Sequence, residues 1–100
     1  MFKGTTPVHI FDVSIDTSLI KEVKITYSQN DKEVLTKRTV DCVIDEGTIS
    51  TSLTQEETFL FESCKFVSIQ LRILTIAGDA LITEPMMISV AKCFDDEVLV

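Results

Sequence analysis

The stretch from Lys65 to Lys92, KFVSIQLRILTIAGDALITEPMMISVAK, constrains the fold of this chain more than any other. In its first half every second residue is a large apolar one, namely Val67, Ile69, Leu71 and Ile73. This two-residue period is typical of a strand with one buried face. Gly78-Asp79 ends the pattern, and a second apolar run extends from Leu81 to Val90. The two runs predict a long antiparallel β-hairpin at the centre of an all-β domain, with Gly78 at positive φ in the turn.

A proline interrupts the second arm of this hairpin. Pro85 has no N–H group to donate to a strand ladder, and it restricts the backbone of the residue before it. We therefore expect a bulge, a bend or a change of sheet between Thr83 and Met86.

Other segments share the two-residue period. The clearest is Leu19 to Gln29, with Val23, Ile25 and Tyr27 on one face. Further strands are predicted over residues 8–13 (an edge strand that follows Pro7), 33–37, 38–46 (centred on Val40, Cys42 and Ile44) and 49–53.

Residues 54–61, TQEETFLF, differ from this pattern and predict one short helix. Thr54 and Glu57 have the spacing of a capping box, in which each side chain bonds to the backbone N–H of the other residue. The apolar residues that follow, Phe59 to Phe61, are expected to cover one open end of the core.

Together these elements predict a single domain over residues 1–100, because one hundred residues are too few for two independent cores. The fold class is all-β: a two-layer antiparallel β-sandwich, immunoglobulin-like in the loose sense, with one short helix near residues 54–61. The chain has no tryptophan for the core of an antibody-type domain.

Charge and hydropathy limit the kinds of partner that this chain can bind. Nine basic and sixteen acidic residues leave a net charge of 9 − 16 = −7, which disfavours binding to nucleic acid and to anionic membrane surfaces. The basic residues are scattered in the sequence, and the one adjacent pair, Lys37-Arg38, is interpreted as a solvated turn edge. No secretory signal and no membrane-spanning run is recognised, so we expect a soluble cytoplasmic protein.

No residues suggest catalysis, a cofactor or a metal, and we expect no enzyme. His9, the only histidine, is expected at the surface of an edge strand. Asp12 and Asp16 lack the spacing of a calcium loop and are interpreted as solvated carboxylates. The three cysteines are too far apart in sequence for a zinc site and are expected to be reduced thiols that act as small apolar residues: Cys42, Cys64 and Cys93.

The remaining hypothesis is that this protein functions through its surface. The acidic end Asp95 to Glu97 precedes an apolar tail, and we expect the following residues at a contact with a protein partner or with a second copy in a homo-oligomer: Phe2, Phe94, Val98, Leu99 and Val100. The alternative is a small ligand- or carbohydrate-binding β-sandwich. Against that alternative, sugar platforms need exposed aromatic faces, and Tyr27 is the only tyrosine.

Five segments in order carry a resemblance that covers nearly the whole chain: FKGTTP, ITYSQND, SLTQEETFLF, VSIQLRILTIAGDAL and DDEVL. With them the chain resembles a family of small proteins of Firmicutes bacteria and their prophages. The resemblance implies a phage-derived structural or assembly protein, in the cytoplasm of a bacterial host or associated with the virion. It implies no catalytic residues. Cys93-Phe94 and the terminal Val100 depart from the family pattern.

Overall fold

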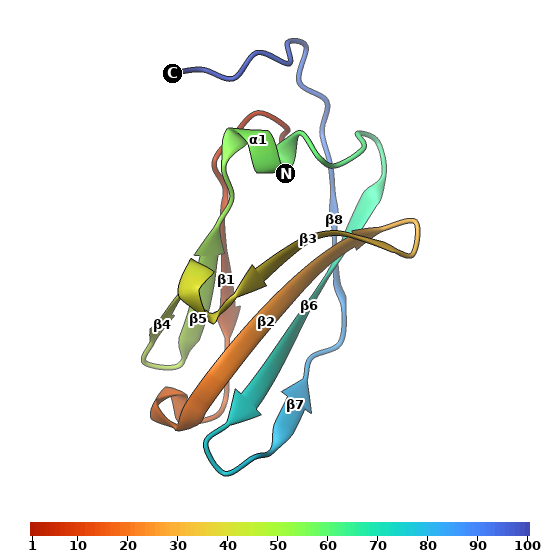
Figure 1. Cartoon of the computed structure of the whole chain (residues 1–100). Helices are drawn as coiled ribbons and strands as arrows, with labels where there is room; N and C mark the ends of the chain where they lie inside the picture. The colour runs from red at the N-terminus through yellow and green to blue at the C-terminus, as the bar shows by residue number, and fades with distance from the viewer.

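The computed structural model describes residues 1–100 and consists of two antiparallel β-sheets with one short α-helix at one end (Figure 1). Buried side chains from both sheets form one hydrophobic cluster between them. The predicted all-β sandwich is therefore confirmed.

The smaller sheet has three strands in the order β1-β5-β4: β1 (Val8–Asp12), β5 (Thr48–Ser52) and β4 (Cys42–Asp45). β4 and β5 form a hairpin whose turn holds Gly47 at a φ of +71°, a conformation that glycine adopts without strain. β1 pairs only with β5 and is the predicted edge strand.

The larger sheet is built on two ten-residue strands, β2 (Ile20–Gln29) and β6 (Phe66–Thr75), which pair antiparallel. β3 (Lys32–Arg38) returns along β2 after a turn in which Asn30 and Asp31 both have positive φ, as a two-residue I′ hairpin requires. Side chains alternate as the sequence predicts, so that the inward-facing residues of β2 and β6 are buried: Val23, Ile25, Tyr27, Val67, Ile69, Leu71 and Ile73.

The predicted central hairpin is present, with a divided second arm. β7 (Ala80–Ile82) and β8 (Met86–Ser89) pair one after the other with the same edge of β6. Pro85 lies between them, in the predicted break, and Gly78 adopts a φ of +92° in the turn after β6.

The helix α1 (Gln55–Thr58) is shorter than the predicted segment, although its capping box is formed as predicted. Phe61 is buried and covers the end of the core, whereas Leu60 is exposed. The four-residue α1 is the longest helix, so no helix of this protein could span a membrane.

The prediction of a strand over residues 38–46 is wrong in its first half. Arg38 ends β3, and Thr39–Asp41 form a 3-10 turn that leads from the larger sheet to the smaller one. The Thr39 hydroxyl accepts a hydrogen bond from the Val23 amide at 2.9 Å, which fixes this crossing. Val40 lies at the apex of the turn and is 93% exposed.

Candidate interaction surfaces

Both chain ends lie at the α1 end of the sandwich (Figure 1). Phe2 forms a parallel bridge with Ala91, whose amide donates to the Met1 carbonyl at 2.7 Å. The N-terminal amine donates to the Ser89 carbonyl at 2.8 Å. These bonds hold the first residues along the segment that follows β8 and leave the Phe2 side chain largely exposed.

The C-terminal tail, residues 92–100, leaves the sheets and passes over α1 (Figure 1). Gln55 of α1 holds both backbone groups of Leu99: its amide nitrogen donates to the Leu99 carbonyl, and its amide oxygen accepts from the Leu99 N–H, each at 2.8 Å. The side chains of Phe94 and Val100 are nevertheless fully exposed, and that of Leu99 is mostly exposed.

The terminal patch is the set of residues predicted as an interaction site: Phe2, Phe94, Val98, Leu99 and Val100. The structure places the segments that carry them at the same end of the molecule. Val98 differs from the other four because it is half-buried in a shallow cleft that Lys3, Glu56, Phe59 and Asp96 also line.

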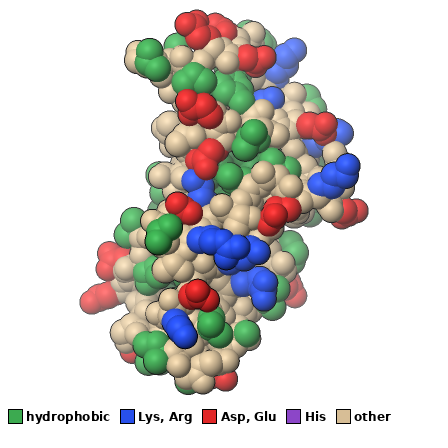
Figure 2. All heavy atoms as spheres, in the orientation of Figure 1, with side chains coloured by type: hydrophobic (Ala, Val, Ile, Leu, Met, Phe, Trp, Pro, Cys, Tyr) green, Lys and Arg blue, Asp and Glu red, His purple; other side chains and the backbone are tan.

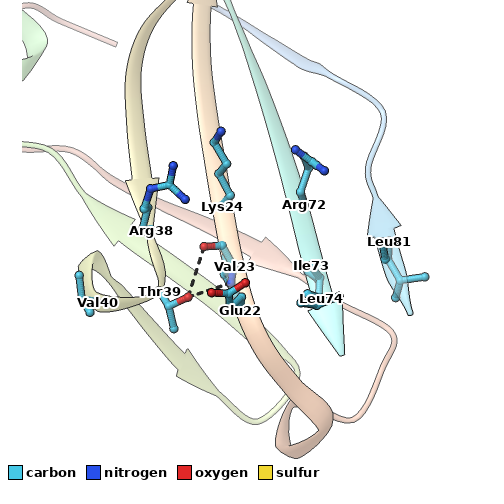
Figure 3. Close-up of a pocket in the computed structure, with 11 residues that line it drawn as sticks. Glu22, Val23, Lys24, Arg38, Thr39, Val40, Arg72, Ile73, Leu74 and Leu81 are labelled. Carbon is cyan, nitrogen blue, oxygen red and sulfur yellow. Dashed lines mark hydrogen bonds between the residues drawn. The ribbon is translucent and has the colours of Figure 1, made fainter. Parts of the chain in front are cut away.

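A second surface was not predicted. Lys24 of β2 lies directly opposite Arg38 of β3 on one side and directly opposite Arg72 of β6 on the other. Their neighbours Val23 and Ile73 are buried, so all three charged side chains project from the outer face of the larger sheet (Figure 3). We call Arg38, Lys24 and Arg72 the basic row.

The basic row forms no ion pair within the chain. The only two ion pairs within 4.0 Å are Lys37–Glu57 and Lys65–Glu62, and neither includes a residue of the row. Like charges on directly opposite strand positions repel one another. The three neighbouring cations therefore repel one another, and a bound anionic group would reduce this repulsion.

The row borders an open groove of about 500 Å³. Its apolar lining includes Val40 from the 3-10 turn and Leu81 from β7, while Glu22 is its only acidic residue. Basic side chains gather around the middle of this face (Figure 2). A groove with cations flanked by apolar groups can bind an acidic segment that also carries apolar residues.

The sequence interpretation missed this surface because its residues lie 14 and 34 positions from one another, from Lys24 to Arg38 and from Arg38 to Arg72. The pair Lys37-Arg38 is also not a solvated edge as a whole. Arg38 projects outward, whereas Lys37 is 8% exposed and donates to both carboxylate oxygens of Glu57, at 2.8 and 2.7 Å. The signal that could have found the row was the register of β2 with both β3 and β6.

The prediction that His9 is a surface residue is wrong. Its side chain is half-buried, and Nδ1 lies 2.7 Å from the hydroxyl oxygen of Tyr27, which is fully buried. Burial lowers the pKa of His9, and the nearby N-terminal amine lowers it further. Burial likewise raises the pKa of Tyr27. The pair is a hydrogen-bonded polar contact at the margin of the core.

Only some of the cysteines act as small apolar residues. Cys42 packs against the core, and burial raises the pKa of its thiol. Cys93 is half-buried, whereas Cys64 is exposed in a turn with a φ of +64°. All three thiols are free. Asp12 is exposed, and Asp16 caps the 3-10 turn Thr17–Leu19 by accepting from the Ser18 amide at 3.0 Å.

The structure contains no group of three or more His, Cys, Asp or Glu side chains that could hold a metal ion. A scan against protein-family models, a search of curated proteins and a search of solved structures each found no match to this chain.

Proposed function

We propose that this chain is a non-enzymatic protein-interaction domain of phage origin that acts in assembly, by contact with a protein partner or with further copies of itself. The observation that carries the proposal is the terminal patch. Phe2, Phe94, Leu99 and Val100 expose apolar side chains at one end of the molecule. Clustered exposed apolar groups mark contact sites, because covering them removes apolar surface from water.

The strand order supports the proposal of an immunoglobulin-like arrangement. The order β1-β5-β4 facing β3-β2-β6-β7 corresponds to strands B-E-D facing C′-C-F-G of immunoglobulin domains. Phe2 forms its parallel bridge with Ala91, in the segment that follows β8. Such modules serve as contact domains in many assemblies.

The phage origin and the location rest on the family resemblance. We propose that the protein is made in the cytoplasm of a bacterial host and is incorporated into, or helps to build, a virion. The carbohydrate-binding alternative gains no support from Tyr27, which is fully buried and cannot offer a stacking face.

Light scattering at micromolar concentration tests the proposal on the full chain and on a chain truncated before Asp95. We expect an oligomer for the full chain and a monomer for the truncated one. Far-UV circular dichroism of the truncated chain checks its fold, and Val43→Ser, an exposed apolar position on β4, is the matched control. An oligomer of equal mass without the tail would contradict the role of the tail. Two monomers would refute self-association and leave a different protein as the partner to be captured from the virion.

A further inference from the structure

We propose that the basic row is the receptor for the acidic C-terminal tail of a second copy of this chain. This inference rests on the proposed function and names the two surfaces that meet. Asp95, Asp96 and Glu97 would enter the groove above Arg38, Lys24 and Arg72, with the apolar residues Val98 to Val100 beside them.

Charge complementarity selects this occupant. The chain carries sixteen acidic residues against nine basic ones, yet three of the nine share one cross-strand row. Asp95 to Glu97 is the only run of three consecutive acidic residues in the sequence. It thus matches the row in number and is opposite in sign.

The length of the basic row also matches the length of the acidic run. Neighbouring strands lie about 4.8 Å apart, so the row extends over roughly 10 Å from Arg38 to Arg72. Three extended residues span at most about 10 Å. The acidic run can therefore reach all three cations when it crosses the strands. Once Leu99 leaves Gln55 and Val98 leaves its own cleft, the apolar residues after the run can contact Val40 or Leu81 at the edges of the groove.

The tail of the same copy is directed elsewhere. Gln55 holds the backbone of Leu99 over α1, while the row lies near the middle of the outer face of the larger sheet (Figures 1 and 3). The exposed segment from Phe94 to Glu97 is thereby presented at one end of the molecule. Because the two surfaces lie on different parts of one chain, copies can join as a reciprocal dimer or as a chain of copies.

Charge exchange tests the contact in the full-length protein. The face variant Lys24→Glu/Arg72→Glu and the tail variant Asp95→Lys/Asp96→Lys should each associate about tenfold or more weakly than the natural chain, since each sets like charges against one another. An equimolar mixture of the two variants should form a mixed complex, because the exchanged charges again match. The matched control is Lys21→Glu/Lys32→Glu, which makes the same charge change at exposed positions outside the row.

Binding of a labelled peptide with the sequence CFDDEVLV tests tail docking on the basic row independently of self-association. It should bind the full-length tail variant, fail to bind the face variant, and lose affinity as salt is raised. If the natural chain is an oligomer that the face variant leaves intact, the tail docks elsewhere and only this inference is overturned. If the natural chain is a monomer and the peptide does not bind, self-association fails as well. If inorganic phosphate binds the row and the peptide does not, the row is a small-anion site and the inference is overturned.

Discussion

Replacing Lys37 with methionine should destabilise the fold through Glu57. Lys37 donates to both carboxylate oxygens of Glu57, and the two side chains are only 11% and 23% exposed. Methionine keeps most of the aliphatic stem but leaves the carboxylate with a single remaining partner of this capping box, the Thr54 amide at 2.8 Å. Removing one member of a fully buried pair costs about 3–5 kcal/mol. Because water still reaches Glu57, we expect about 2 kcal/mol, or roughly 8–16 °C in Tm for a domain of this size.

The pH dependence of stability tests whether the unpaired carboxylate of Glu57 causes the loss in Lys37→Met. Burial alone would raise the pKa of Glu57, but the hydrogen bonds from Lys37 and Thr54 outweigh it and hold the pKa below its usual 4.5. The natural chain should therefore keep this stabilisation above pH 4.5 and lose it as the pH falls through the lower folded-state pKa. In Lys37→Met the lowering effect of Lys37 is lost, so Glu57 takes up a proton at a higher pH than in the natural chain. The stability gap between the two chains should narrow as the pH falls below neutral.

Urea unfolding of both chains at neutral pH and near pH 4 measures this gap. The double variant Lys37→Met/Glu57→Gln should recover part of the loss at neutral pH, because no unpaired charge remains. Lys32→Met, at an exposed position of the same strand, is the control and should change stability little. An unchanged stability of Lys37→Met at neutral pH, or two parallel pH profiles, would refute the reasoning.

Three other predictions follow from single contacts. Tyr27→Phe removes the hydrogen-bond partner of His9 and should lower the free energy of unfolding by about 1 kcal/mol in a denaturant titration. In the natural chain the pKa of His9 is lowered from 6.5, so the unfolded chain binds a proton first as the pH falls. Its stability should therefore decrease below pH 6.5. Gly4→Ala should destabilise the fold more than Gly78→Ala in thermal melts, because a Cβ at Gly4 meets an aromatic side chain at 3.0 Å and one at Gly78 meets nothing within 4 Å. Gln55→Ala should release the tail and speed hydrogen exchange of the tail amide that Gln55 holds, without a large change in Tm.

The regular part of the fold could be predicted from sequence because the two-residue period directly reports which face of a strand is buried. β2 and β6 supply seven of the twelve core residues, and all seven lie at the alternating positions that the sequence predicts to face inward. The turn at Gly78 was also predicted correctly, since glycine adopts positive φ readily.

Two kinds of feature could not be predicted in this way. The prediction of a strand over residues 38–46 was wrong because the alternation of apolar residues continues through Val40. The crossing between the sheets is instead fixed by a tertiary hydrogen bond from the Val23 amide to the Thr39 hydroxyl. The basic row escaped notice because it depends on register across three strands. The order of charges along the sequence does not indicate which positions of different strands become neighbours.

The divided edge of the larger sheet has a consequence for how copies can meet. A long flat edge strand offers its free N–H and C=O groups to any other strand and leads to uncontrolled ribbons. Here the outer side of β6 is occupied by two strands of three and four residues, with Pro85 between them. This border is short, interrupted and lacks one N–H, so growth by strand addition is discouraged there. At this border, association is thus left to side chains and chain ends, where geometry and charge can limit how many copies join.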